Sequence, residues 1–144
     1  MTSSEIERWL DPEAPGLSLE ARLAFGVHCA LAVYHHPGWT RWAEDWLDGR
    51  AQAPEDAAAA HVLVLEDYRN HCFTDLPLDM TARTAADLVT SGAFLLATQP
   101  DDAALAPTIA AHATQAVWCA LKAHPTLDLH EQLRVMLARF HRRG

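Results

Sequence analysis

The sequence predicts an all-α protein, a single compact bundle of about five main helices with a short tryptophan-rich helix and an N-terminal helical turn. Alanine is abundant and β-branched residues are sparse, which favours helix over strand. Apolar residues recur at spacings of three and four along most of the chain. The eight prolines and six glycines fall mostly between these apolar segments, where they would end helices.

The chain of 144 residues has about the usual length of one domain, and half of its residues are hydrophobic. We therefore expect one helical domain over residues 1–144, with an N-terminal arm at 1–16 and the bundle at 17–142. In the arm, Thr2 and Glu5 have capping-box spacing and would open a helix through Leu10. The turn-forming segment 11–16 then breaks it.

Ser18 is placed to cap a helix over about 19–35. This segment is apolar on most sides, which is typical of a central helix. Pro37 and Gly38 stop it, and the tryptophan-rich helix follows. Gly49 is placed to end that helix in a left-handed turn.

Pro54 suits the first position of the next helix, which we expect to run to about Cys72. Seven of its residues fall on or near one face and predict its buried side: Ala57, Ala60, His61, Val64, Leu65, Tyr68 and Cys72.

A loop over 73–78 is followed by a helix that starts at Asp79 or Thr81 and ends near Thr98. Gly92 lies in its middle and would allow close approach of a neighbour such as a tryptophan ring. In the next helix, either Pro107 is the start or residues 102–106 form a first turn that tolerates it. Asp128 then caps a last helix from Leu129 to about Arg142.

The formal net charge is −8, and its distribution is uneven. All 19 acidic residues lie at or before Glu131, whereas Arg134, Arg139, Arg142 and Arg143 follow it. An acidic body repels a phosphate backbone, so nucleic acid is not expected as a ligand. A basic partner protein is the better electrostatic match, although the same charge would also serve solubility alone.

The three cysteines are far apart and flanked by apolar residues, which favours buried free thiols in a reducing compartment. The N-terminus is acidic and has no apolar segment typical of a signal peptide. The longest apolar run, 23–34, is too short to span a bilayer. We therefore expect a cytoplasmic protein without a membrane partner.

Nine histidines raise the alternative of a metal-binding enzyme or sensor. Asp67 and His71, at i and i+4, form the best local pair, and His61 and His112 are the further candidate ligands. However, there is no HExxH motif and no CxxC pair. We expect no cofactor and no catalytic residue, and we expect core histidines with a backbone or carboxylate partner at His28, His61 and His112.

Trp39, Trp42 and Trp46 share one helical face, at i, i+3 and i+7. Trp42 and Trp46 are better explained as core residues, whereas the sequence decides least between core and surface for Trp39. As the alternative, Trp39 and Trp42 would anchor a partner, since tryptophan is enriched at interfaces. The neighbouring carboxylates, which we call the acidic edge, would surround them: Glu44, Asp45, Asp48, Glu55 and Asp56.

The segments WAEDWLDG (42–49) and PEDAAAA (54–60), with alanine-rich helices near 82–97 and 103–120, resemble small all-helical immunity proteins of bacterial polymorphic-toxin systems. The resemblance covers about residues 19–139. It implies a stoichiometric inhibitor that binds a cognate toxin, and it transfers no catalytic residue. The sequence leaves a homodimer open as well.

Overall fold

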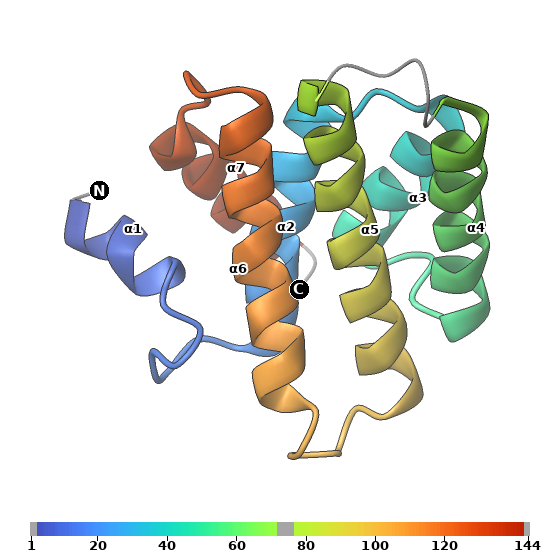
Figure 1. The fold of residues 1–144 in the computed structure, drawn as a ribbon. Helices are drawn as coiled ribbons and strands as arrows, with labels where there is room; N and C mark the ends of the chain where they lie inside the picture. Colours follow the sequence, from blue (N-terminus) through green and yellow to red (C-terminus); the bar gives the residue numbers. More distant parts are fainter. Residues whose placement is uncertain (1–2, 72–76, 143–144) are drawn as a thin grey trace.

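A computed structural model describes residues 3–71 and 77–142 of the chain. Within this part it contains seven helices and no β-strand, which confirms the all-α prediction. The helices are α1 (Ser3–Trp9), α2 (Leu19–Val33), α3 (Pro37–Leu47), α4 (Pro54–His71), α5 (Pro77–Thr98), α6 (Ala106–Ala123) and α7 (Leu129–Arg142). Figure 1 shows α6, α5 and α4 side by side, with α2 packed behind α5 and α6.

The central helix is α2, as its apolar sequence predicts. Every residue from 21 to 30 is buried, and α2 contacts α3, α5, α6 and α7. Gly26 makes the tight packing possible, because a Cβ atom there would lie 2.9 Å from Val89 Cγ1 and 3.2 Å from the Ala113 carbonyl oxygen. The backbones of α2, α5 and α6 therefore approach more closely than any larger residue allows.

Local capping signals fix most helix ends where the sequence places them. The Ser18 hydroxyl accepts a hydrogen bond from the Ala21 amide at 3.1 Å, and the Asp128 carboxylate accepts one from the Glu131 amide at 3.1 Å. Gly49 has φ +84° directly after α3, the left-handed conformation that glycine adopts without strain.

Two expectations along the chain need revision, those for the start of α5 and for the neighbour of Gly92, and the open question about Pro107 is answered. Helix α5 begins at Pro77 rather than at Asp79 or Thr81, because proline suits the first turn of a helix. Helix α6 begins at Ala106, so Pro107 lies in its first turn and does not kink it. The close neighbour of Gly92 is Leu23 Cδ2, which would lie 2.7 Å from an added Cβ, and not a tryptophan ring. The expected roles of Thr2, Cys72 and the loop at 73–76 fall outside the described residues.

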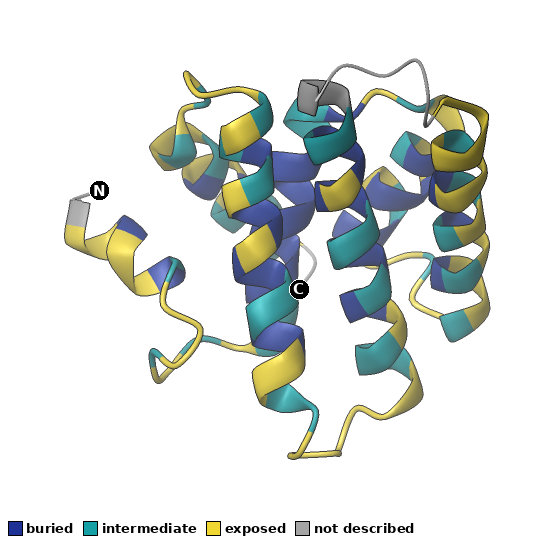
Figure 2. Ribbon diagram, in the orientation of Figure 1, coloured by how far each residue is buried: buried dark blue, intermediate teal, exposed yellow. Residues whose placement is uncertain are grey.

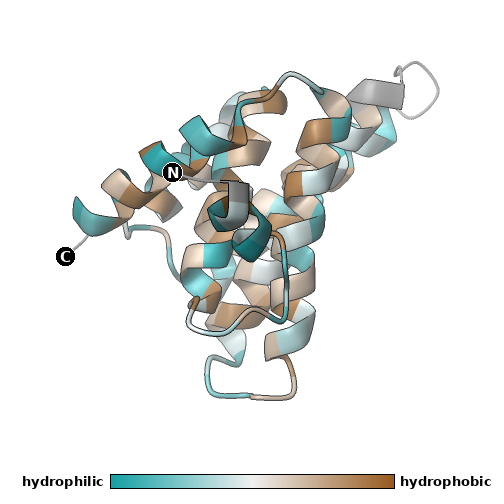
Figure 3. Cartoon of the chain, turned by 90° about the vertical axis from the view of Figure 1, so that its left-hand side faces the viewer, coloured by the Kyte–Doolittle hydropathy of each residue, from teal (hydrophilic) through white to brown (hydrophobic). Residues whose placement is uncertain are grey.

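The N-terminal arm contacts the bundle both through α1 and through the segment 11–16 that follows it. The Trp9 ring meets the Phe25 ring edge to face at 5.9 Å, and the Arg22 guanidinium donates to the carbonyls of Asp11 and Ala14 at 2.9 and 2.6 Å. Figure 3 shows α1 in front of the bundle, with a hydrophilic outer side. All seven helices contribute to one cluster of buried apolar residues.

Helix α4 lies at the outer edge of the bundle, where it packs mainly on α5 and α3. Its buried residues are only Ala57, Ala60 and Val64. Leu65 and Tyr68, which the sequence pattern assigns to the buried side, are exposed. Figure 2 shows that much of the outer side of α4 is exposed. The apolar face of α4 is thus broader than the surface that α3 and α5 cover.

Candidate functional site

The three tryptophans of α3 lie in the core, which corrects the alternative in which Trp39 and Trp42 anchor a partner. Trp39 is fully buried and donates its indole N–H to Thr90 Oγ1 of α5 at 2.9 Å. Trp42 and Trp46 are also buried, with ring centroids 6.3 Å apart. A buried side chain cannot contact a partner unless the bundle opens, so these rings stabilise the fold.

The acidic edge lies at the end of α3 and the start of α4, where Glu44, Asp48, Glu55 and Asp56 are exposed and Asp45 is half-buried. Arg139 of α7 reaches back to this edge. Its Nη2 lies 2.5 Å from Glu44 Oε2, and its Nε lies 2.8 Å from Asp48 Oδ1. The hydrogen bond from Arg139 lowers the pKa of Asp48 below its usual value.

Arg50 adds a second cation to the acidic edge, 2.9 Å from Asp45 Oδ1 and 3.5 Å from Asp48 Oδ2. Glu55 and Asp56 have no ion-pair partner among the residues that the structure describes. The edge thus holds five carboxylates, two guanidinium groups pair with them, and the charge of Arg142 acts on Asp48 as well. The acidic edge keeps a negative charge, but this charge is smaller than the sequence suggests. Arg139 is far from the edge in the chain, so its pairing with Glu44 and Asp48 could not be read from the sequence.

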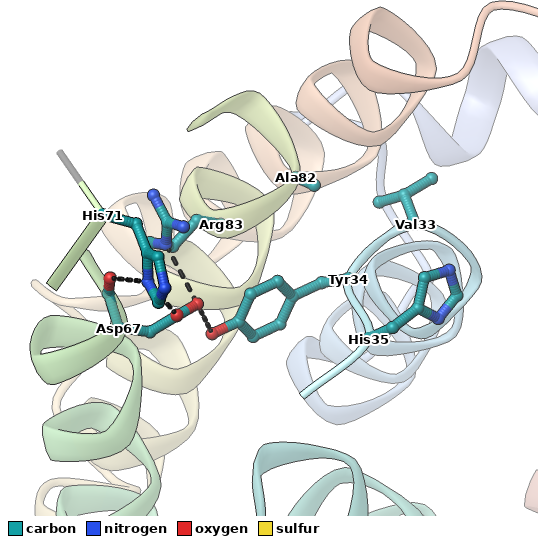
Figure 4. Close-up of a pocket in the computed structure, with 7 residues that line it drawn as sticks. All are labelled: Val33, Tyr34, His35, Asp67, His71, Ala82 and Arg83. Atoms are coloured by element: carbon teal, nitrogen blue, oxygen red, sulfur yellow. Dashed lines mark hydrogen bonds and ion pairs between the residues drawn. The ribbon is translucent and has the colours of Figure 1, made fainter. Parts of the chain in front are cut away.

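A second polar cluster surrounds the carboxylate of Asp67 at a pocket of about 270 Å³ between α2, α4 and α5. Asp67 Oδ2 accepts the Tyr34 hydroxyl at 2.7 Å and Arg83 Nε at 3.1 Å, and His71 Nδ1 lies 3.0 Å from Oδ1. Figure 4 shows these three side chains converging on Asp67, whereas His35 points away from it.

Burial alone would raise the pKa of Asp67, but hydrogen bonds from Tyr34 and Arg83 outweigh it and hold the pKa below its usual value. A carboxylate that is ionised and satisfied in this way is a poor general base. The Asp67 cluster therefore acts as a largely buried ion pair that links the end of α2 to α4 and α5.

His61, Asp87 and Ser91 supply the residue types of a hydrolase triad, but not its geometry. Asp87 Oδ1 lies 2.5 Å from His61 Nε2, and Ser91 Oγ lies 3.5 Å from the same nitrogen and 3.3 Å from Asp87 Oδ1. In a triad the carboxylate and the serine bind opposite nitrogens of the ring. Here both approach Nε2, so the imidazole cannot be oriented by Asp87 while it accepts a proton from Ser91.

The four candidate metal ligands occupy three separate places. Asp67 and His71 share the cluster described above, His61 pairs with Asp87, and His112 Nδ1 lies 2.7 Å from the carbonyl oxygen of Thr108. Within residues 3–71 and 77–142, no three His, Cys, Asp or Glu side chains are grouped to hold an ion.

Sequence reasoning missed the exposed apolar side chains of α4. Val62 is 50% exposed, Leu65 45% and Tyr68 47%. The sequence did indicate this exposure, because these residues spread around α4 beyond the narrow stripe of Ala57, Ala60 and Val64. One neighbouring layer of helices can bury only such a stripe.

Comparison of the chain with protein-family models, with curated proteins and with solved structures gave no match. In the part of the chain that the structure describes, none of the helices has the length and apolar character needed to cross a bilayer.

Proposed function

We propose that this protein is a non-catalytic binding protein that recognises a basic partner through its acidic surface, as an immunity-type inhibitor recognises its toxin. The acidic edge carries the proposal, because its five carboxylates outnumber the guanidinium groups of Arg50 and Arg139 that pair with them and of Arg142, whose charge also acts on Asp48. Exposed carboxylates in excess attract a cationic surface and raise the rate of encounter.

Glu55 and Asp56 are the residues of the edge best suited to meet a partner. Both are exposed in the first turn of α4, and neither has an ion-pair partner among the described residues. A cation from a partner would gain attraction there without displacing an internal guanidinium. The positive end of the α4 dipole also stabilises the two charges when the protein is unbound.

The test begins with affinity purification from producing cells, identification of the retained protein, and calorimetry of the purified pair at 50 and 500 mM NaCl. We expect a partner of high isoelectric point whose affinity falls as salt rises. Expression of this protein should also relieve any growth arrest that the partner causes.

The double variant Glu55→Gln/Asp56→Asn should weaken this binding, mainly through a slower association rate. Glu7→Gln/Glu13→Gln is the matched control, because it removes the same charge from exposed positions in the N-terminal arm. Equal effects of the two variants, or an affinity that does not depend on salt, would refute recognition through the acidic edge.

A further inference from the structure

A pocket of about 410 Å³ lies between the first turn of α2, the last turn of α3 and the C-terminal end of α5, which is drawn in yellow in Figure 1. Small-molecule sites usually measure roughly 300–1,000 Å³, so this volume admits a compact ligand. None of the described residues that line it belongs to the acidic edge. Six of them are apolar: Leu19, Trp46, Ala93, Leu96, Ala97 and Pro100.

Small side chains on α5 explain why this space is open. Ala93 and Ala97 are four residues apart, so they lie on the same side of the helix. Their methyl groups leave room beside the ring of Trp46, which lines the pocket from α3. An aromatic ring and short apolar side chains together suit the apolar body of a small molecule.

The side chain of Gln52 is held with its oxygen available to a ligand. Gln52 Nε2 donates to the carbonyl oxygens of Trp46 and Arg50, both at 2.9 Å. These two bonds use both amide protons, and they fix the orientation of the amide, because an oxygen in place of Nε2 would face two other acceptors. No described residue donates a hydrogen bond to Gln52 Oε1, so this atom is an acceptor that a ligand can use.

The end of α5 adds a backbone acceptor. The carbonyl of Leu96 would normally accept from the amide four residues later, but that residue is Pro100, which has no N–H group. The Gln99 amide donates to the carbonyl of Leu95 instead, at 3.0 Å. Leu96 and Pro100 both line the pocket, so the negative end of the α5 dipole borders it.

The charge of the lining favours a cation. Glu20 of α2 is half-buried, and it is the one charged side chain among the described residues that line the pocket. Its carboxylate joins Gln52 Oε1 and the Leu96 carbonyl as acceptors. The side-chain donors of the lining are limited to the indole of Trp46, because the Gln52 amide is already used.

Nearby basic side chains do not reverse this balance. No Lys or Arg occurs between residues 84 and 121, whereas residues 101 and 102 are aspartates. Arg8 and Arg22 donate to backbone carbonyls of the segment 11–16, and Arg50 is paired with the acidic edge. Arg41 is exposed on α3, about 140° around the helix from Trp46.

We propose that this pocket binds a small organic cation, in which an amine is joined to a compact apolar body. The ammonium group donates to the Glu20 carboxylate and to Gln52 Oε1, and the apolar body packs on Trp46 and Ala97. An anion would be repelled by Glu20 and by the end of α5. The proposal is independent of the partner that the acidic edge recognises, because the two sites share no residue.

The probe is 2-phenylethylamine, and 2-phenylethanol and 3-phenylpropanoate are the neutral and anionic compounds of similar shape. With the full-length ¹⁵N-labelled protein, we expect the amine to shift the amide signals of residues 19–20, 52 and 93–99. The Kd should lie in the millimolar range, which is ordinary for so small a ligand. The alcohol should bind about fivefold more weakly, as loss of one partly exposed charge pair implies, and the acid more weakly still.

Glu20→Gln should weaken binding of the amine about fivefold and leave binding of the alcohol unchanged, because only the amine carries a charge. Glu13→Gln is the matched control, since it removes the same charge from an exposed position outside the pocket. It should leave the Kd of the amine unchanged.

Ala97→Leu places a larger side chain in the pocket and should abolish the shifts that the amine causes. Its control is Ala111→Leu, at a half-buried position of α6 that does not line the pocket. Circular dichroism would verify that both variants fold. Unchanged binding of the amine to folded Ala97→Leu would refute the proposal.

The remaining outcomes also decide the question. If all three compounds bind the pocket equally, it accepts apolar bulk alone and the preference for a cation is wrong. Shifts confined to residues 44–48 and 55–56 would place the amine on the acidic edge, and no shift at tens of millimolar amine would show no binding; either result overturns the proposal. The proposed function survives each of these results, because its own test uses a protein partner and variants outside the pocket.

Discussion

His28 makes the stability of this protein depend on pH. The imidazole is buried on α2, and its Nε2 has no hydrogen-bond partner among the described residues. Burial, together with the positive charge of Arg139, lowers the pKa of His28 from 6.5 to about 4 against the opposing charge of Glu44. The side chain is therefore neutral in the folded protein at pH 7.

The sign of the effect follows from proton binding. Between pH 6.5 and about 4 the unfolded chain binds a proton at His28 and the folded chain does not, so acid favours unfolding. A change of one pKa unit corresponds to about 1.4 kcal/mol. The free energy of unfolding should consequently fall by about 3 kcal/mol from pH 7 to pH 4 because of this one group.

The variant His28→Leu tests this calculation, because leucine fills a similar volume and does not titrate. We expect it to be at least as stable as the wild type at pH 7, since it removes a buried polar atom without a partner. Its stability should fall by about 3 kcal/mol less than that of the wild type between pH 7 and pH 4. Urea unfolding followed by tryptophan fluorescence at several pH values measures both quantities.

His35→Leu is the control, because His35 is exposed next to the end of α2. The free energy of unfolding of His35→Leu should depend on pH as that of the wild type does. Parallel losses of stability in the wild type and in His28→Leu would refute the reasoning, because they would show that His28 takes up its proton equally in both states.

Three further variants test the packing of the bundle by chemical denaturation. Thr90→Val should cost about 1–3 kcal/mol, because it leaves the buried indole N–H of Trp39 without its acceptor; Trp39→Phe on the Val background should then cost less than on the wild type. Gly26→Ala should be destabilising despite the better helix propensity of alanine, because the added Cβ would meet a buried side chain and a backbone carbonyl; a net gain in stability would contradict this. Asp67→Asn should cost about 1.5–3 kcal/mol, because it removes the charged acceptor of the hydrogen bonds from Arg83 and Tyr34, and its deficit should shrink at acidic pH, where the wild-type carboxylate also becomes neutral.

The sequence predicted those features that depend on residues close together in the chain. Ser18, Gly49 and Asp128 act within three or four residues of their own positions, so local spacing identifies them. The central position of α2 was also predictable, because a helix that is apolar on most sides must be covered on most sides.

What the sequence could not predict depends on contacts between distant segments. The ring of Trp39 is buried in the core, and its indole N–H is satisfied there by Thr90, which lies 51 residues away. The acidic edge is partly neutralised because Arg139 returns to it across 91 residues from Asp48. No helical periodicity carries that information, so neither of these contacts could be predicted from the sequence.

The central helix imposes an order of events on biosynthesis. Helix α2 ends at Val33, whereas α6 and α7, which cover two of its sides, begin at Ala106 and Leu129. A ribosome must therefore complete most of the chain before Leu23, Val27 and their neighbours are shielded from water. During that interval the emerging polypeptide presents its most apolar segment to the cell, so chaperone contact during translation should concentrate on it.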